Sequence, residues 1–397
     1  MRKLWFLLNI IVTFANLVVT CDIVISAGSY YNEIADISAE RVVFMEKKIN
    51  VAVIGCGTIA NIAHIPAYVK NEKVNIKYFC DIIPERAEKA VKEYGCGTAI
   101  TDYQVAVNDP EIDAVSVCTP NYAHAPISID FLKAGKTVLC EKPAARTYAE
   151  ALTMQQAQKE TGKNLSIGVV NRFNDSINKI KSMIDAGELG EIYQVYISFR
   201  DHRSIPGLGG PFTTKDIAGG GVLIDWGVHF LDIVMYCCSD PEPKTVSTEC
   251  FTKLGSPISD YVFESMWAGP PIADGICDVE EAMTGLVRTS GPIITLNGAW
   301  AQNIGQREMF IDFLGTKAGV RLQYGEGFTV YGVKDGKLTK TEYEAPTTNH
   351  FENEINAFVD SVETGKKLPS NIDINITTSK LMQAMYDSAE QHREIVL

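Results

Sequence analysis

Three polar side chains in this 397-residue chain have the types and spacing for acid–base chemistry. Lys142 stands two positions after the apolar run 137–140, where a charge is costly to desolvate without a partner or ligand. Asp225 and His229 are four positions apart on a predicted helix, so they share one face, and a carboxylate beside an imidazole raises its basicity. An ion pair on a helix surface is the alternative. The three glycines at 219–221 favour a ligand site, because they permit close backbone approach.

A glycine-rich turn lies upstream of these side chains. Gly55 and Gly57 follow a predicted strand and precede a predicted helix, which is the context that a dinucleotide-binding fingerprint requires. Gly55 permits a tight turn, Gly57 lets the backbone approach a pyrophosphate, and Ala60 keeps helix and strand close. The phosphates would lie at the positive end of the helix. The turn therefore predicts a dinucleotide site built from Gly55, Gly57, Thr58, Ile59 and Ala60.

An acidic residue supports this interpretation. Asp81 ends the second predicted strand, 26 residues after Gly55, where a carboxylate binds the adenosine ribose hydroxyls. A carboxylate there favours NAD over NADP, because a 2′-phosphate would face a like charge. The nearby Arg86 keeps NADP open as the less favoured cofactor. The alternative role for Asp81 is to cap the helix that begins at Pro84.

Two further segments are predicted to reach the same edge of the sheet. Residues 119–121 follow a predicted strand and are placed to line the nicotinamide ribose. His124 lies near them, although a lone histidine at a helix start is more often structural or solvent-facing. The predicted cofactor contacts on this side are Thr119, Pro120, Asn121, His124, Glu141 and Lys142.

The elements that position these residues are predicted to form a parallel sheet. From residue 47 to about 168, short apolar runs alternate with helical stretches, which is typical of βαβ units. Right-handed crossovers make such a sheet doubly wound. The predicted strands are 49–54, 74–80, 113–118, 136–140 and 164–169. The predicted helices are 59–70, 84–94, 124–134 and 147–161.

After Arg172 the segments become longer and alternate, which indicates a mostly antiparallel sheet with one face covered. The expected fold class is α/β, with a doubly wound Rossmann domain at 45–168 and an α+β domain with a large open sheet at 169–397. The C-terminal helices have room to pack back on the first domain. The predicted strands are 191–200, 244–252, 279–289, 292–301, 307–314, 319–322 and 328–333. The predicted helices are 174–186, about 221–237, 349–364 and 373–391.

Composition narrows the class of protein. The hydrophobic fraction of 46% and charged fraction of 21% are those of an ordinary globular chain. A net charge of −13 argues against nucleic acid or an anionic membrane as a general partner. The ten cysteines are scattered without any Cys-x-x-Cys spacing, so we expect free thiols in a cytoplasmic protein and no metal site.

The first 44 residues do not fit that picture. Arg2 and Lys3 precede the apolar run 4–20, which resembles a signal peptide or a short membrane anchor. Met45 begins a segment that is a normal start for such a Rossmann domain. We therefore predict that residues 1–44 are translated upstream sequence. If they are a genuine signal, the protein is exported or membrane-anchored instead.

Four segments together resemble the Gfo/Idh/MocA family of oxidoreductases. They are the turn at 51–60, Asp113-Ala-Val-Ser-Val-Cys-Thr-Pro-Asn121, Gly135-Lys-Thr-Val-Leu-Cys-Glu-Lys-Pro143 and Gly219-Gly-Gly-Val-Leu-Ile-Asp-Trp-Gly-Val-His229. The resemblance implies NAD(P)-dependent chemistry on sugars, cyclitols or related polyols, and an open sheet used for contacts in a homodimer or homotetramer. It also implies that Lys142 contacts the reacting hydroxyl, that Asp225 helps hold the substrate, and that His229 is the acid–base group.

The chemistry of the residues agrees with those roles. Oxidation of a secondary alcohol needs a base for the hydroxyl proton, and a histidine titrates in the right range. Lys142 can stabilise the developing alkoxide by charge and hydrogen bonding. Two other functions stay open: a redox-neutral enzyme that cleaves glycosides through transient sugar oxidation and elimination, and a non-catalytic NAD-binding regulator.

A last group of candidates has weaker signals. Arg172 follows a predicted strand and is placed to bind cofactor or substrate. His202 lies in a polar stretch ahead of a Pro/Gly-rich loop that is placed to cover a sugar, although a solvated loop fits equally well. Trp226 and Trp300 have rings that can stack on a sugar, although buried aromatic residues usually belong to the core.

Overall fold

The computed structural model describes residues 5–14, 17–26, 47–345 and 347–397. The chain forms two units, Met1–Lys47 and Lys48–Leu397. In the first, β1 (Trp5–Phe14) pairs antiparallel with β2 (Leu17–Ser26). Much of the extension predicted at 1–44 lies outside the described residues, so its origin stays a prediction.

The larger unit begins with a six-stranded parallel sheet of order β5-β4-β3-β6-β7-β8. Its strands are buried on both faces, and alternate side chains serve different faces. Val51 and Val53 pack with one layer of helices, while Ala52 and Ile54 pack with the other. All five predicted strands are found within one residue of their predicted bounds; β5 was not predicted. The strands are β3 (Ile49–Ile54), β4 (Val74–Cys80), β5 (Thr98–Ile100), β6 (Ala114–Val117), β7 (Thr137–Glu141) and β8 (Leu165–Gly168).

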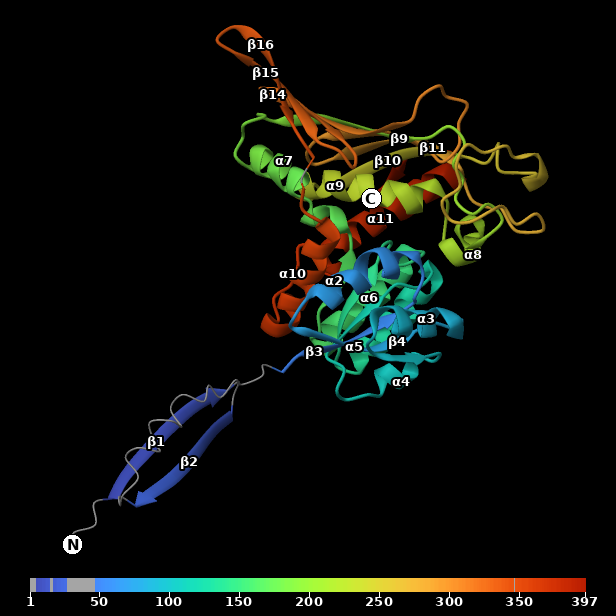
Figure 1. Ribbon diagram of the computed structural model, residues 1–397. Helices are drawn as coiled ribbons and strands as arrows, with labels where there is room; N and C mark the ends of the chain where they lie inside the picture. The colour runs from blue at the N-terminus through green and yellow to red at the C-terminus, as the bar shows by residue number, and fades with distance from the viewer. Residues whose placement is uncertain (1–4, 15–16, 27–46, 346) are drawn as a thin grey trace. The chain divides into compact units, whose positions relative to one another are not determined.

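Helices cover both faces of this sheet, so it is doubly wound as predicted (Figure 1). One layer contains α2 (Ile65–Lys70) and α3 (Pro84–Tyr94). The other contains α4 (Gln104–Val107), α5 (His124–Lys133) and α6 (Tyr148–Thr161). A C-terminal helix, α10 (His350–Thr364), joins the first layer and buries Phe358 there.

The second sheet has nine strands in the order β16-β15-β14-β13-β9-β12-β11-β10-β17. Every neighbouring pair is antiparallel except β9 with β12. Strand β16 was not predicted, because its side chains are almost all exposed and carry no apolar alternation. The strands are β9 (Ile192–Arg200), β10 (Pro243–Phe251), β11 (Ala282–Thr289), β12 (Ile293–Ala299), β13 (Glu308–Gly315), β14 (Ala318–Gln323), β15 (Phe328–Lys334), β16 (Lys337–Tyr343) and β17 (Ile395–Val396).

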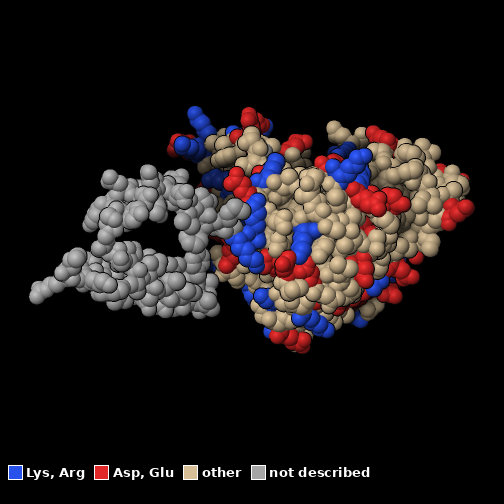
Figure 2. Space-filling model, turned by 60° about the horizontal axis from the view of Figure 1, so that its bottom comes forward, with Lys and Arg blue, Asp and Glu red and all other residues tan. Residues whose placement is uncertain are grey.

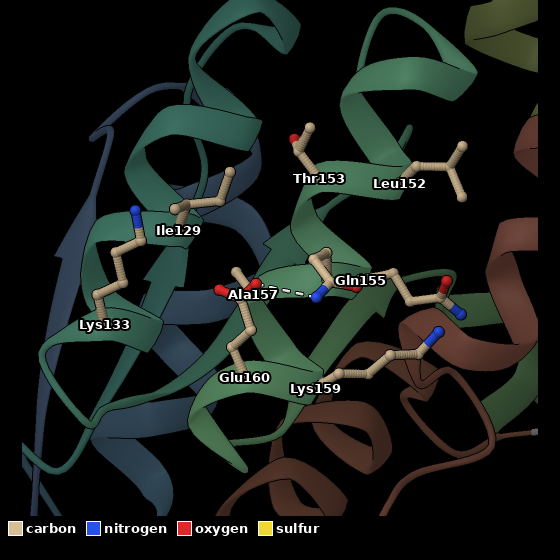
Figure 3. Close-up of a pocket in the computed structure, with 9 residues that line it drawn as sticks. Ile129, Lys133, Leu152, Thr153, Gln155, Ala157, Lys159 and Glu160 are labelled. Atoms are coloured by element: carbon tan, nitrogen blue, oxygen red, sulfur yellow. Dashed lines mark hydrogen bonds between the residues drawn. The ribbon is translucent and has the colours of Figure 1, made fainter.

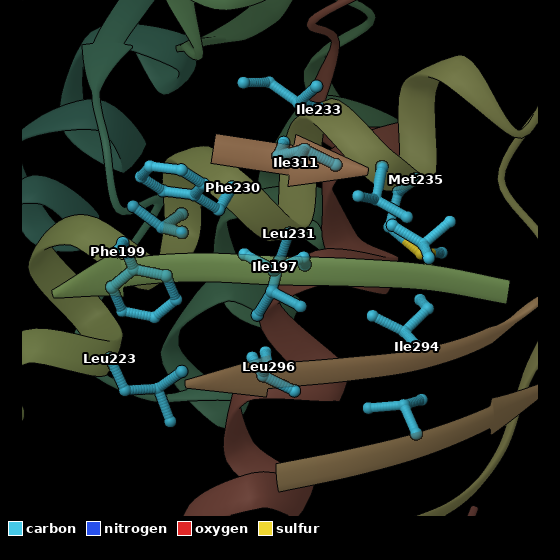
Figure 4. Close-up of a cluster of buried hydrophobic side chains, with 14 of the residues drawn as sticks. Ile197, Phe199, Leu223, Phe230, Leu231, Ile233, Met235, Ile294, Leu296 and Ile311 are labelled. Atoms are coloured by element: carbon cyan, nitrogen blue, oxygen red, sulfur yellow. The ribbon is translucent and has the colours of Figure 1, made fainter. Parts of the chain in front are cut away.

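One face of the second sheet is covered by α7 (Asp175–Asp185), α9 (Val228–Cys237) and α11 (Ile372–Gln391) (Figure 1). Apolar side chains of α9, such as Leu231, pack between Ile197 and Ile311 of the sheet (Figure 4). Among the described residues, one helical stretch, Lys215–Cys237, is long and apolar enough to cross a membrane by composition. Its apolar window is 78% buried within the protein, because it supplies this core.

The surface carries charges of both signs. Figure 2 shows lysine and arginine interspersed with aspartate and glutamate on one face of the molecule. The outer face of the nine-stranded sheet instead carries large exposed aromatic side chains, including Tyr193 and Tyr331.

Candidate active site

The glycine turn has the geometry that the fingerprint predicts. Gly55 has φ +92°, and a Cβ there would lie 2.5 Å from the Cys118 carbonyl oxygen. A Cβ on Gly57 would meet nothing within 4 Å, so the backbone faces open space there. The helix that follows starts with a π-helical segment, η1 (Ala60–His64), and Ala60 is fully buried against the sheet. The open surface of Gly57 at a helix N-terminus fits a pyrophosphate.

Asp81 supports this turn directly. One carboxylate oxygen accepts a hydrogen bond from the Cys56 backbone N–H at 2.9 Å. The other accepts from the Ile83 N–H at 2.9 Å, but α3 has no side-chain hydrogen bond at its N-cap, Ile83, so the capping alternative is wrong. A carboxylate has about four acceptor positions. Asp81 therefore keeps capacity for ribose hydroxyls, and that contact stays a prediction.

The segment after β6 contains one hydroxyl in need of a partner. Thr119 Oγ1 is buried and has no hydrogen bond to any described residue, so a bound cofactor would satisfy it. Pro120 is exposed next to it. The Asn121 side-chain amide donates to the Ala218 carbonyl at 2.7 Å, which ties this segment to the second domain.

His124 has a structural role. Its ring nitrogens lie 2.8 Å from the Pro143 carbonyl and 2.8 Å from the Thr119 carbonyl, and the residue is 1% exposed. Burial lowers its pKa. The predicted cofactor contact through the His124 side chain is wrong, because both nitrogens hold the loops together from inside.

Lys142 and Asp225 form a contact that the sequence analysis did not predict, across the two domains. The Lys142 Nζ donates to an Asp225 carboxylate oxygen at 3.1 Å and to the Asp225 carbonyl at 3.0 Å. The second carboxylate oxygen accepts from the Trp300 indole N–H at 3.3 Å. Trp300 is fully buried, so it serves the core and holds Asp225 rather than stacking on a ligand. The ammonium thus sits at the carboxyl edge of the Rossmann sheet with one of its three donors left for a substrate.

His229 has a different partner from the one expected. Among the contacts of the described residues, none joins His229 to Asp225; its Nδ1 lies 3.3 Å from the Asn171 amide nitrogen. Burial lowers the pKa of His229 well below its ordinary value, and the charges of Lys142 and His350 lower it further. The expectation that Asp225 raises the basicity of His229 is therefore wrong.

The Asp225 carboxylate has other partners. Asp225 lies in the π-helical turn η5 (Leu223–Gly227), and His229 lies in the α-helix that follows. The two carboxylate oxygens of Asp225 accept hydrogen bonds from the Lys142 ammonium and the Trp300 indole N–H, so Asp225 pairs with these groups rather than with His229. The start of the turn is anchored by Glu280, whose carboxylate accepts from the Gly221 and Leu223 N–H groups at 2.9 and 3.0 Å.

Glu141 turns away from the predicted cofactor site. One carboxylate oxygen pairs with His64 Nε2 at 2.8 Å, and the other accepts from the Lys142 backbone N–H at 3.1 Å. Burial would raise the pKa of Glu141, but the hydrogen bond and charge of His64 bring it below the ordinary value. The Glu141 side chain thus fixes the backbone that carries Lys142, and the contact of this residue with a cofactor stays a prediction.

Arg172 is also a core residue. Its side chain is 1% exposed and donates to both carboxylate oxygens of Asp232, at 2.8 and 2.9 Å. A third nitrogen donates to the Pro369 carbonyl at 2.8 Å. The guanidinium has no face left for cofactor or substrate, so that prediction is wrong.

The remaining candidates lie at the periphery. His202 is exposed and pairs with Glu264 at 3.4 Å. Trp226 is half-buried and packs against the core of the second sheet. Their contact with a substrate stays a prediction.

Two residues of the site escaped the sequence analysis. Asn171 and Tyr324 surround His229, with the Asn171 amide nitrogen 3.3 Å from the Tyr324 hydroxyl oxygen. Burial raises the pKa of Tyr324, while its electrostatic coupling to Lys142 and Asp225 shows that it faces the same site. No sequence signal marks them, because both reach the site only through tertiary packing. In this segment the sequence analysis selected Arg172, which is next to Asn171, because Arg172 is charged.

A shallow groove elsewhere does not belong to this site. It lies between α5 and α6, where Ile129, Leu152 and Lys133 border it (Figure 3). None of the residues discussed above lines it.

The fold and the site define a nicotinamide-dependent oxidoreductase: a Rossmann domain with a dinucleotide turn, joined to an open-sheet domain that supplies an acid and an imidazole. Residues 49–169 match the oxidoreductase family with an NAD-binding Rossmann fold, and residues 177–321 match the GFO/IDH/MocA C-terminal domain. The chain belongs to the GFO/IDH/MocA oxidoreductase family, as its sequence resemblance indicated, and uses NAD.

Similar proteins agree with that membership. The chain is 30% identical to D-glucoside 3-dehydrogenase of Escherichia coli (strain K12) over 88% of this chain and 97% of that protein. It is 24% identical to inositol 2-dehydrogenase of Rhizobium meliloti (strain 1021), over 86% and 97%. Levoglucosan dehydrogenase in complex with NADH has the same fold, with a TM-score of 0.76 and 20% identity over 88% of this chain and 99% of that one.

Proposed function

We propose that the protein transfers hydride between NAD and a secondary hydroxyl of a sugar, cyclitol or glycoside. The observation that carries the proposal is the joint placement of Lys142 Nζ, held by Asp225, and a neutral imidazole, His229, at the cofactor edge of the sheet. The glucoside and inositol dehydrogenases among the relatives support this substrate class.

Each residue of the site has a separate role in the proposed reaction. His229 Nε2 takes the hydroxyl proton, because a histidine with a lowered pKa is neutral at pH 7. Lys142 Nζ donates to the oxygen as negative charge develops there. Asp225 orients the ammonium and accepts a hydrogen bond from the substrate. NAD, when bound, would supply the hydride acceptor. Gly55, Gly57 and the start of the helix at Thr58 would hold its pyrophosphate, and Asp81 its adenosine ribose.

The test is a panel of glucosides, free sugars and inositols, assayed separately with NAD and NADP. Stoichiometric NADH formation on at least one polyol is expected. Product release without net NADH would favour the redox-neutral, glycoside-cleaving alternative. Tight NAD binding with neither outcome would favour a regulator.

Several finer statements belong to the same proposal. The domains divide near residue 168, and His202 and Trp226 contribute to the substrate side of the site. The protein is cytoplasmic and forms a homodimer or homotetramer. A family resemblance and the exposed aromatic side chains of the second sheet support the oligomer.

A further inference from the structure

Asn171 is the immediate hydrogen-bonding neighbour of the proposed base. It lies in the short helix η3 (Val170–Phe173) after β8 and is 6% exposed. Its amide nitrogen is 3.3 Å from His229 Nδ1 and 3.3 Å from the Tyr324 hydroxyl oxygen. Among the described residues, none bonds to His229 Nε2 or to the Asn171 amide oxygen. The nitrogen of His229 that remains for a ligand is therefore Nε2.

The amide decides which nitrogen carries the proton. A neutral imidazole has one N–H, so Nδ1 and Nε2 cannot both accept. When the amide NH₂ points at Nδ1, Nδ1 accepts, the proton resides on Nε2, and Nε2 cannot take a proton from a substrate. When the amide is turned by 180°, its oxygen accepts from Nδ1–H and Nε2 presents a lone pair. The imidazolium that forms after proton transfer needs the same oxygen at Nδ1.

Tyr324 lets the amide take either orientation. Its hydroxyl can accept a hydrogen bond from the amide NH₂ group or donate one to the amide oxygen. The hydrogen bond between Tyr324 and Asn171 is therefore kept in both orientations of the amide. The ring is fixed by stacking on Phe230 at 4.7 Å and by a backbone hydrogen bond from its N–H to the Met309 carbonyl at 2.8 Å. Rotation of the amide thus keeps its contacts with His229 and Tyr324, while the NH₂ group takes the former position of the oxygen, which has no hydrogen-bonding partner among the described residues.

We propose that Asn171 is the positioning residue that sets the tautomer of His229, with its amide oxygen accepting the Nδ1 proton so that Nε2 receives the substrate proton. This inference rests on the proposed function, in which His229 is the base. The structure places the amide nitrogen 3.3 Å from Nδ1, and a 180° rotation of the amide brings the oxygen to that position.

The neutral amide also suits the role of His229 as a proton acceptor. The charged or titratable groups that face His229 are Lys142 from the end of β7, His350 from the start of α10 and Tyr324 after β14, while Asp225 is committed to Lys142. A carboxylate at position 171 would favour the imidazolium. An amide orients the ring without adding charge, so the base stays unprotonated at neutral pH.

The first arm of the test reads the tautomer itself. Nitrogen-15 NMR of histidine-labelled full-length protein with bound NADH distinguishes Nδ1–H from Nε2–H, and the chain has six histidines to assign. His229→Gln identifies the signal. We expect Nδ1–H in the wild type and in Asn171→Asp, which can only accept, and loss of that preference in Asn171→Leu. A wild-type complex held as Nε2–H would overturn the proposal.

The second arm reads the pH profile of turnover. Asn171→Leu should lower kcat roughly 10²-fold, the lower range for loss of a general base. Asn171→Asp should restore most of this rate and move the acid limb of kcat/KM upward. A matched control is Asn108→Leu, which removes a 2.8 Å amide hydrogen bond to the Gln104 carbonyl on the exposed end of α4 and should move neither reading.

The arms separate the two proposals. A wild type that oxidises no member of the substrate panel sinks the proposed function, while the NMR arm still decides the tautomer. An active wild type with Asn171→Leu at full rate, or with Asn171→Asp as impaired as Asn171→Leu, overturns the role of Asn171 and leaves the function standing.

Discussion

Lys142 is the side chain whose loss should most reduce turnover. Its Nζ is held by Asp225 and retains a donor for the substrate oxygen. Lys142→Met should lower kcat by about 10²–10³-fold, the effect of removing one donor to a developing oxyanion. NAD affinity should change little, because the glycine turn lies elsewhere. Steady-state rates and fluorescence titration with NADH measure the two effects.

The exposed Lys133 on α5 offers the matched control. Lys133→Met removes the same charge from the same domain and should alter neither rate nor affinity. Full turnover in Lys142→Met would refute the assigned role of the ammonium.

The pH dependence of oxidation follows from His229. The base must be unprotonated, and its pKa lies well below the ordinary value near 6.5 because of burial first and Lys142 second. Activity should therefore be lost only as the pH falls below about 6.5, through that lowered pKa. Lys142→Met removes a neighbouring positive charge, so the acid limb of the residual kcat/KM should move upward. A limb at or above the ordinary pKa in the wild type would contradict the burial argument.

Sequence reasoning identified Lys142, Asp225 and His229 by type but misjudged how they pair. The spacing of Asp225 and His229 suggested a pair, but the Asp225 carboxylate is held by Lys142 and Trp300, which are distant in the sequence. Arg172 had the chemistry of a ligand contact, yet Asp232 holds it in the core. A charged residue at the end of a strand can bind a ligand or form a buried ion pair. The sequence alone does not distinguish these roles, because the partner residue lies far away in the chain.

The turn between β3 and the first helix allows a paired glycine test. In Gly55→Ala, the new Cβ meets the Cys118 backbone at 2.5 Å with φ near +92°, and a backbone atom cannot move aside. Destabilisation of about 1–3 kcal/mol and loss of NAD binding are expected. Gly57→Ala meets nothing within 4 Å, so stability should be unchanged while NAD binding weakens. Urea unfolding and NADH titration decide between these outcomes. Unimpaired NAD binding in Gly57→Ala would show that the pyrophosphate does not approach this backbone.

Helix α10 carries an acid that should destabilise the protein at neutral pH. Glu354 is 1% exposed and has a carboxylate oxygen without a hydrogen-bonding partner. Burial and the negative charges of Glu141 and Asp232 raise its pKa well above the ordinary value. The folded state thus binds a proton that the unfolded state has released. Stability is therefore lost as the pH rises from the unfolded pKa through the raised folded pKa.

Glu354→Gln imitates the protonated acid and removes this dependence. The free energy of unfolding of Glu354→Gln, relative to that of the wild type, should increase with pH. The increase should be up to about 1.4 kcal/mol per pH unit above the ordinary glutamate pKa. Urea unfolding at pH 5 and pH 8 measures it. An equal effect at both values would mean that Glu354 is ionised in the folded protein.

Elements were more predictable than contacts. The parallel strands form continuous apolar runs, which is why β3 and β4 were found with their observed bounds. The return of α10 to the Rossmann layer had no local signal, because the apolar face of a helix does not identify the sheet that it covers. Strand β16 had none either, since almost all of its side chains face solvent.

The two sheets of the larger unit depend on each other at the site. Asn121 reaches Ala218, Lys142 reaches Asp225, and α10 begins at His350 near the proposed base. Neither domain alone holds both the ammonium and the imidazole in place. Reaction with the substrate therefore requires both domains, while dinucleotide binding requires the residues of the first domain.

The outer face of the nine-stranded sheet should form the contact between subunits. Tyr193 and Tyr331 are 51% and 47% exposed there, so association would remove about half of each aromatic side chain from water. Tyr193→Lys combined with Tyr331→Lys should reduce the mass in light scattering from a multiple of 43.6 kDa to that of one chain, with unchanged circular dichroism. Leu152→Lys alters the groove between α5 and α6 and should leave the oligomer intact. Dissociation by Leu152→Lys alone would move the interface to the helical face of the Rossmann domain, because a charge disrupts only the surface that is desolvated on association.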